Sequence, residues 1–421
     1  MWLDPDNWQE IFNTLQKNKI RSLLTAFGVF WGIFMLIIML GSGKGLENGV
    51  TSDFSGTATN SVFLWTRNTT KPYKGYPAGR RFRFNNSDIA AIYKNIPEVE
   101  YLAPRNQLSN NANSNNVVYK LKTGTFSIYG DYPDIRNISL VDIVQGRYLN
   151  ALDIKLQRKV AIIGERVLQE LFEKNELAIG KYIRVKGIYF KVVGVYKSRD
   201  KDDPDERRSK AINIPFTTFQ KAFNYGDSVG WFSMTAKKGS SAAQLRKDVM
   251  VFLANRHQVD PNDERAFGYW NMEKEYLKIS RLFDGINFLI WFVGVFTLMA
   301  GIIGVSNIML ITVKERTKEF GIKRAIGAPP SSIITQIILE TILLTSVSGY
   351  FGLVAGVGLI ETVAAVLIHL NVNSTMFANP EIDFQVAITA IIVLIFSGAL
   401  AGLIPANRAV SIKPVDAIRD E

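Results

Sequence analysis

Four long apolar runs, separated by polar stretches, constrain the fold of this 421-residue chain more than any other feature. The first run, residues 23–40, has Thr25 as its only polar side chain. A helix needs about 20 consecutive apolar residues to cross the hydrocarbon core of a bilayer. Later runs of similar or greater length begin near Phe283, Ile333 and Phe384. We therefore predict an α-helical membrane domain of four transmembrane helices, over residues 21–41, 283–311, 333–370 and 384–404.

The segment before the first apolar run, residues 1–20, has the pattern of an amphipathic helix. Its apolar residues recur at i, i+3, i+4 and i+7, which predicts a helix lying in the membrane interface on the cytoplasmic side; they are Trp8, Ile11, Phe12 and Leu15. The apolar run that follows is longer than the core of a signal peptide, and no A-x-A cleavage site follows it. We therefore expect an uncleaved membrane anchor.

Basic residues near the apolar runs set the predicted orientation, because lysine and arginine concentrate in short cytoplasmic loops. They precede the first run, lie between the second and third, and follow the fourth, whereas residues 371–383 contain neither Lys nor Arg. We therefore predict that both termini, residues 312–332 and the tail 405–421 are cytoplasmic. Residues 42–282 and the loop 371–383 are then external.

Two carboxylates interrupt the third apolar run. Glu340 is about two helical turns into the run, where its side chain can reach the interface. Glu361 lies where we expect the segment to bend into an external elbow. A carboxylate buried in lipid is costly, so an ion-coupling role is the alternative for both.

The external segment carries the positive charge of the chain. Residues 42–285 contain 38 basic and 26 acidic side chains, a difference of +12. The external location excludes nucleic acid as the expected partner and favours anionic lipid headgroups, an acidic partner or a solvated surface. The chain has no cysteine, so disulfides and thiolate metal sites are excluded.

The pattern of the external segment predicts two strand–helix–strand units separated by an insertion. The pattern predicts an α+β domain with a ferredoxin-like, porter-type subdomain: strands at 60–67, 99–107, 230–237 and 266–271, with helices at 87–95 and 241–257. A β-rich insertion at about 112–216 contains predicted strands at 116–122, 159–163, 182–185 and 189–196 and a helix at 165–173. Residues 271–282 are helix-prone and lead into the second apolar run, which predicts a rigid stalk.

Residues 312–332 lie between two predicted membrane helices and contain five basic side chains. The loop satisfies the positive-inside rule. Gly327, Pro329 and Pro330 end any helix formed here. The stretch before them is long enough for a short helix on the cytoplasmic face that binds a partner. A basic loop that follows the positive-inside rule and a helix that binds a partner are compatible interpretations.

Signatures of catalysis are poor. No phosphate-binding G-x-x-x-x-G-K-[ST] motif occurs, and the G-x-S-x-G match at 226–230 precedes a predicted strand, where a nucleophile elbow would need a strand before it. The two histidines, His257 and His369, have no metal-ligand spacing to one another. We expect neither catalysis nor a metal or cofactor in this chain.

The chain resembles the MacB/FtsX-type permeases, the membrane subunits of the type VII ABC transporter superfamily. Residues 314–328, KERTKEFGIKRAIGA, match the family's E-R-T-x-E-x-G-I-x-x-A-x-G-A signature at every fixed position. Further similarity lies in NKIRSLLTAFG at 18–28 and PANRAVSIKPVDAIR at 405–419. In the external segment the similar residues are 146–148, 160–164 and 180–181 with 190–194.

The resemblance implies a dimer of permeases, homomeric or heteromeric, in the bacterial inner membrane, driven by a cytoplasmic ABC ATPase that holds ATP and Mg²⁺. A periplasmic adaptor and an outer-membrane channel are further partners to consider. The implied ATPase-docking residues form a coupling helix: Arg316, Thr317, Glu319, Phe320, Gly321, Ile322, Ala325, Ile326, Gly327 and Ala328. Apolar contact is expected from Phe320, Ile322, Ala325 and Ile326, with Arg316 and Glu319 setting register. Gly28 and Gly32 form a G-x-x-x-G pair that we assign to helix packing in the dimer.

MacB-type exporters carry their ATPase before the permease, whereas this sequence begins at the permease, so we expect a separate ATPase subunit. The resemblance implies export by mechanotransmission, in which motion passes along the stalk and substrate does not cross a central channel. A lipoprotein-releasing permease, an FtsX-like regulator of an external hydrolase and a stand-alone sensor without an ATPase are the alternatives.

Overall fold

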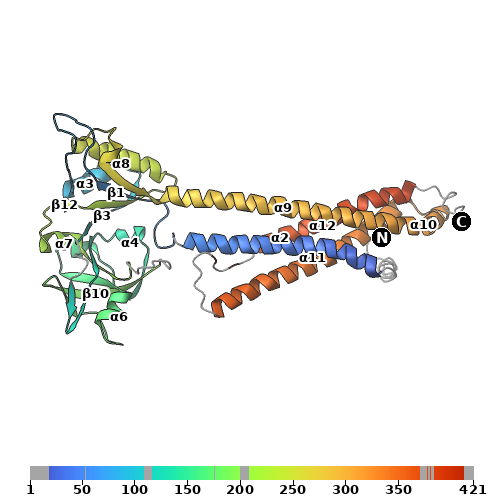
Figure 1. The fold of residues 1–421 in the computed structure, drawn as a ribbon, viewed down its shortest axis with the longest axis horizontal. Helices are drawn as coiled ribbons and strands as arrows, with labels where there is room; N and C mark the ends of the chain where they lie inside the picture. The colour runs from blue at the N-terminus through green and yellow to red at the C-terminus, as the bar shows by residue number, and fades with distance from the viewer. Residues whose placement is uncertain are drawn as a thin grey trace. The chain divides into compact units, whose positions relative to one another are not determined.

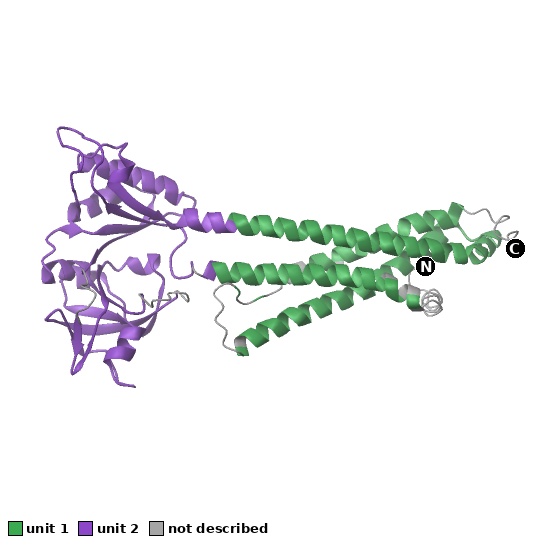
Figure 2. Ribbon diagram, viewed as in Figure 1, with its two compact units in different colours: residues 1–50, 281–421 green, residues 51–280 purple. Residues whose placement is uncertain are grey.

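The computed structural model describes residues 19–52, 54–108, 116–174, 176–199, 208–369, 377, 380 and 384–411. They fall into two compact units, one of residues 1–50 and 281–421 and one of residues 51–280 (Figure 2). The predicted N-terminal amphipathic helix before Lys19 and the tail after Ser411 lie outside the described residues.

The first unit is helical. Four of its helices are long and apolar enough to cross a membrane, which confirms the predicted helical membrane domain. They are α2 (Lys19–Ser52), α9 (Met272–Glu315), α11 (Pro330–His369) and α12 (Phe384–Ser411), and the short α10 (Thr317–Ala325) lies between α9 and α11 (Figure 1). Their buried side chains form one apolar cluster, which includes Ile33, Val305, Phe320, Ile337 and Ala406.

Helix α9 is longer than the apolar run inside it. Its 44 residues are about twice the roughly 20 that a helix needs to cross the bilayer core. The residues assigned to a stalk form the first turns of this helix, without a break before the apolar run.

Helix α11 differs from the prediction at its C-terminal end. We expected an external elbow near Glu361, but the helix continues unbroken through Glu361 to His369. The residues that follow Glu361 are TVAAVLIH, and none of them is a glycine or proline that would end a helix. Glu361 is exposed on this continuous helix.

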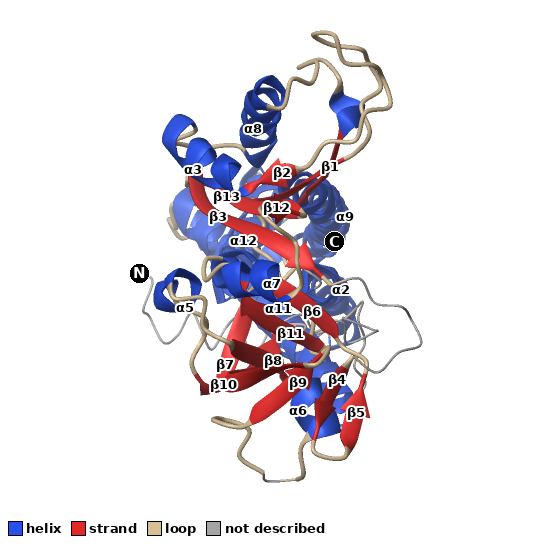
Figure 3. Cartoon of the chain, turned by 90° about the vertical axis from the view of Figure 1, so that its left-hand side faces the viewer, coloured by secondary structure: helices blue, strands red, loops and turns tan. Residues whose placement is uncertain are grey.

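The second unit contains the predicted ferredoxin-like subdomain. Its four strands lie in the order β14-β1-β13-β3, all antiparallel: β1 (Ser61–Thr66), β3 (Val99–Gln107), β13 (Trp231–Ala236) and β14 (Phe267–Asn271). Helices α3 (Asn86–Asn95) and α8 (Ala242–Arg256) cover one face of this sheet (Figures 1 and 3). Ile92, Leu245 and Val249 of these helices share a core with Leu64 and Phe232 of the strands. The α+β prediction is therefore confirmed.

The β-rich insertion extends the same sheet. From β3 the order continues β6-β11-β8-β10-β9-β4-β5, and β7 pairs with β10 (Figure 3). The strands are β4 (Val117–Tyr119), β5 (Lys122–Gly124), β6 (Ser127–Asp131), β7 (Val141–Gly146), β8 (Val160–Gly164), β9 (Tyr182–Val185), β10 (Ile188–Ser198) and β11 (Ala211–Pro215). Short helices α4 (Ile135–Ile138), α5 (Ala151–Lys155), α6 (Glu165–Leu171) and α7 (Phe216–Ala222) connect them, and β2 (Phe84–Asn85) pairs separately with β12 (Ser228–Val229).

The strands of the insertion differ in part from those predicted. Residues 116–122 were expected to form one strand, but β4 and β5 make a hairpin there, and Lys120 has a positive φ of 51° in the turn. Strands β6, β7 and β11 were missed. The two subdomains join where β3 pairs with β6, and a buried ion pair between Arg105 Nε and Asp131 Oδ1, 2.7 Å apart, lies at that junction.

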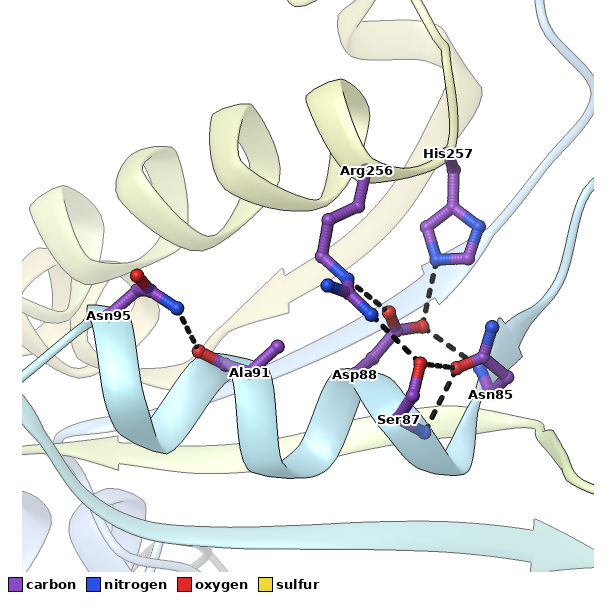
Figure 4. A network of polar contacts seen from close by, with 7 residues as sticks. All are labelled: Asn85, Ser87, Asp88, Ala91, Asn95, Arg256 and His257. Atoms are coloured by element: carbon purple, nitrogen blue, oxygen red, sulfur yellow. Dashed lines mark hydrogen bonds and ion pairs between the residues drawn. The ribbon is translucent and has the colours of Figure 1, made fainter.

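A polar network ties α3 to α8 (Figure 4). The buried Asp88 accepts a hydrogen bond from the backbone of Asn85, which caps α3. It also accepts from Arg256 Nε at 2.9 Å and from His257 Nε2 at 2.8 Å. Burial raises the pKa of Asp88, but the hydrogen bonds from His257, Asn85 and Arg256 outweigh it, so the pKa lies below its ordinary value of 3.8.

Candidate coupling site at helix α10

The local sequence makes α10 a separate short helix. Helix α9 ends at Glu315, and Arg316 follows with φ −95° and ψ 15° before α10 begins. At the other end Gly327 has φ +103°, its N–H donates to the carbonyl of Arg324, and the N–H of Ala328 donates to the carbonyl of Lys323. This is a Schellman motif, in which glycine takes the left-handed conformation. Pro330 then opens α11, a position where its missing N–H costs nothing.

One side of α10 is packed into the helical unit. Phe320 is 1% exposed and Gly321 is buried. Phe320 belongs to the same apolar cluster as Val313 of α9, Ile337 of α11 and Ala409 of α12. Burying a phenylalanine side chain contributes about 1.5–3 kcal/mol, so this contact is a main reason for α10 to stay against its neighbours.

Arg316 connects α10 to α11. Its guanidinium forms two hydrogen bonds with the Glu319 carboxylate, of 2.8 and 2.9 Å, and a third of 3.3 Å with Glu340 Oε2. It also lies 5.0 Å from the centre of the Phe320 ring. The side chains of Arg316 and Glu340 are 13% and 2% exposed. We expected the Glu340 side chain to reach the membrane interface. Instead it is buried, and Arg316 neutralises its charge inside the protein.

Arg324 connects α10 to α12. Its Nη1 donates to the carbonyl oxygen of Val410 at 2.6 Å, close to the end of α12, where helix carbonyls lack partners within the helix. Lys323 forms an ion pair with Glu319 at 3.3 Å. These contacts and the buried Phe320 hold α10 against both following helices.

The opposite side of α10 is exposed and partly apolar. Ile322 is 50% exposed and Ile326 is 82% exposed, and Lys318 and Ala325 are exposed beside them. Residues spaced by three and four lie on one face of a helix. Together Lys318, Ile322, Ala325 and Ile326 form the surface that we name the α10 outer face.

The expected docking set is divided by the structure. Ile322, Ala325, Ile326 and Gly327 are exposed. Phe320 was expected to supply apolar contact to a partner, but its ring is buried among helices of its own chain. The signature identifies which residues recur in the family, but it does not show which side of the helix each of them occupies.

The polar members of the set make contacts within the chain. Arg316 and Glu319 pair with one another, and Glu340 is a further member that the sequence reading missed. The available signal was an acidic residue near the start of an apolar run. Thr317 Oγ1 donates to the carbonyl of Lys314 at 2.7 Å, at the end of α9, and Ala328 completes the Schellman motif.

Gly28 and Gly32 pack α2 against α9 within the chain. A Cβ placed on Gly28 would lie 3.9 Å from Gly301 Cα, and one on Gly32 would lie 3.5 Å from Leu298 Cδ2. Both glycines also line an open groove of about 310 Å³ between the two helices. The G-x-x-x-G pair thus has a partner helix in the same chain.

Among the residues that the structure describes, no cluster of three or more His, Cys, Asp or Glu side chains is arranged to hold a metal ion.

Comparison with known proteins identifies the family. Residues 22–250 match the MacB-like periplasmic core domain, and residues 291–414 match the FtsX-like permease C-terminal domain. The macrolide export ATP-binding/permease protein MacB of Bdellovibrio bacteriovorus is 25% identical over 413 residues, which cover 97% of this chain and 61% of that protein. The pyoverdine export ATP-binding/permease protein PvdT of Pseudomonas putida is 26% identical over 420 residues, 99% of this chain and 60% of that protein.

Other similar proteins match at different lengths. The uncharacterized ABC transporter permease YknZ of Bacillus subtilis is 25% identical over 423 residues, 99% of both chains. The periplasmic region of MacB from Actinobacillus actinomycetemcomitans, a solved structure, has 19% identity and a TM-score of 0.43, covering 54% of this chain and 96% of that one. The chain spans about 60% of the length of the two ATP-binding/permease relatives. The matched domains, over most of its length, show that this chain belongs to the MacB/FtsX-type family of ABC transporter permeases.

Proposed function

We propose that this chain is the permease subunit of an ATP-driven ABC exporter that works by mechanotransmission. A separate cytoplasmic ATPase holds ATP and Mg²⁺, docks on the α10 outer face, and moves the periplasmic domain through α9. The observation that carries the proposal is that α10 is fixed to α11 and α12 on one side, exposes apolar residues on the other, and follows α9 after a single residue.

The connection between α10 and α9 supports transmission of force. The backbone N–H of Arg316 donates to the carbonyl of Thr312 at 3.1 Å, and the N–H of Phe320 donates to the carbonyl of Arg316 at 3.1 Å. Arg316 therefore donates the last of these bonds to α9 and accepts the first one from α10. Helix α9 then runs for 44 residues, so a displacement at its C-terminal end is carried along one helix.

The docking surface in this proposal is smaller than the sequence suggested. Ile322, Ala325 and Ile326 make the apolar contact with the ATPase, whereas Arg316 holds α10 to α11 through Glu340. Both termini and α10 lie on the cytoplasmic side of a bacterial inner membrane, and a second permease completes the transporter. The contacts that hold α10 in place matter, because a docking helix that shifted alone when the ATPase moved would pass no motion to the rest of the chain.

The proposal is tested by co-purification of the full chain with its ATPase from the native host. An Ile326→Glu variant places a charge on the docking face at an 82% exposed position, so folding should be unaffected. We expect the ABC ATPase to be lost from the purified complex. Leu121→Glu, at a 99% exposed position in the other unit, is the matched control and should retain it.

Equal recovery of the ATPase with both variants would contradict docking at α10. Failure to recover any ATPase with the unsubstituted chain would favour a sensor that works alone. Recovery of a bound lipoprotein, or of an external hydrolase without substrate transport, would replace export by one of those activities while keeping the ATPase-driven permease.

A further inference from the structure

An arginine-lined cavity in the external unit has no part in the proposed function. The loop between β1 and β2 folds back on itself, and Asn68 forms an isolated β-bridge with Arg81. A cavity of about 380 Å³ opens beside this bridge. It is lined by Thr66, Arg67, Asn68, Arg81, Phe82 and Arg83.

The three arginines are placed by the backbone. Phe82 is 7% exposed and packs in the core, while Arg81 and Arg83 on either side of it are exposed. Because alternate side chains of an extended segment point to opposite faces, these two arginines share the outward face. Arg67 follows β1 directly, and its N–H donates to the carbonyl of Ala266 at 2.7 Å.

The loop that carries Arg81 is fixed in place. The Asp263 carboxylate accepts hydrogen bonds from Thr70 N at 2.6 Å, Thr70 Oγ1 at 2.6 Å and Lys71 N at 3.0 Å. Arg80 Nη2 donates to the carbonyls of His257 and Gln258 at 2.6 and 2.8 Å. The wall of the cavity is therefore preformed, and a ligand would not have to order it on binding.

The charges in the cavity are not balanced by the protein. Within the described residues, the guanidinium groups of Arg67, Arg81 and Arg83 form no ion pair and no hydrogen bond; Arg67 only lies 5.9 Å from the centre of the Trp65 ring. Other arginines of the same unit are paired with aspartates, namely Arg105, Arg147, Arg158, Arg199 and Arg256. Three like charges around one concave surface create a strong positive potential, which an anion would relieve.

We propose that this cavity binds a small, multiply charged oxyanion, with phosphate or carboxylate groups, either free or as the headgroup of an anionic lipid. Guanidinium groups match the geometry of such groups through paired N–H donors. The volume is within the usual range of small-ligand sites, about 300–1,000 Å³.

The test uses the full chain in phosphatidylcholine nanodiscs, without ATPase or nucleotide, so that it is independent of the proposed function. Isothermal titration calorimetry with pyrophosphate should show saturable binding. The double variant Arg81→Gln/Arg83→Gln should weaken this binding by at least about 10- to 100-fold, as expected when hydrogen bonds to a charged group are lost. Arg184→Gln, which removes an exposed arginine from β9, should leave it unchanged.

Two further arms identify the source of the anion. If lipid headgroups are the ligand, cardiolipin in the nanodisc, whose headgroup holds two phosphates, should weaken pyrophosphate binding, and the double variant should abolish that effect. If the ligand is free, the lipid should have no effect. Absence of saturable pyrophosphate binding, or equal binding by the double variant and the Arg184→Gln control, would overturn the proposal. Binding of poly-glutamate that pyrophosphate does not displace would overturn it in favour of an acidic protein partner.

Discussion

Replacing Arg316 with methionine should destabilise the helical unit strongly, because it leaves a buried carboxylate without its partner. Glu340 is 2% exposed and lies 3.3 Å from Arg316 Nη1. Removing one member of a buried ion pair costs about 3–5 kcal/mol, whereas removing both members is often close to neutral. The double variant Arg316→Met/Glu340→Met should therefore recover most of the stability that Arg316→Met loses.

Glu319 provides the internal control for this cycle. Its side chain is 40% exposed, so its pair with Arg316 resembles a surface salt bridge, which contributes about 0–1 kcal/mol. Glu319→Gln should consequently change stability by less than about 1 kcal/mol. Comparing Glu319→Gln with Arg316→Met therefore shows whether stability is lost because Glu340 is left unpaired or because any contact to Arg316 is lost.

The free energies are measured by reversible unfolding of the full chain in mixed detergent micelles, followed by tryptophan fluorescence. A loss below about 1 kcal/mol for Arg316→Met would refute the argument, since it would place Glu340 in contact with water. A double variant as unstable as the single one would also contradict it, because the cost would then come from lost packing of the arginine stem.

Three further predictions concern single residues. Phe320→Ala should lower the unfolding free energy of the helical unit by about 3–5 kcal/mol, whereas Ile326→Ala should change it by less than about 0.5 kcal/mol, measured in the same micelles; equal effects would contradict the assigned burial. The Asp88 pKa is lowered in the fold, so its contribution to stability should be present above about pH 4 and lost as the pH falls through the folded-state pKa. Asp88→Asn should be less stable at pH 7 and should lack that part of the acid dependence in a pH series of thermal unfolding. Gly327→Ala should cost about 1 kcal/mol because φ is +103° there, and an unchanged melting temperature would rule out the strain.

The membrane helices and the ferredoxin-like core were predictable from sequence because each depends on a local pattern. A bilayer demands length and hydropathy, and both are visible in residues 23–40 without knowledge of any neighbour. The strand–helix–strand units are likewise visible locally, because each strand and helix is a short segment with its own residue pattern. Strands β6 and β11 were missed; their pairing joins segments about 80 residues apart along the chain, which no local pattern reveals.

The candidate site was predictable in position but not in orientation. The sequence predicted a short helix here that ends at Gly327 and the prolines, and α10 occupies Thr317–Ala325 with Gly327 just after it. It could not show that Phe320 faces inward, because that depends on how α9, α11 and α12 pack around it. The pairing of Arg316 with Glu340 spans 24 residues and two helices, so local spacing rules do not reveal it.

Transmission of motion through α9 is the central claim, and a distance measurement tests it most directly. The chain has no cysteine, so spin labels at Leu121→Cys and Glu361→Cys, both exposed, report without background. With the ATPase bound in nanodiscs, the distance distribution between the labels should shift on trapping ATP with vanadate. Three glycines inserted after Arg281, within α9, should abolish the shift while ATP hydrolysis continues. An unchanged shift in the inserted variant, or no shift during active hydrolysis, would contradict transmission through this helix.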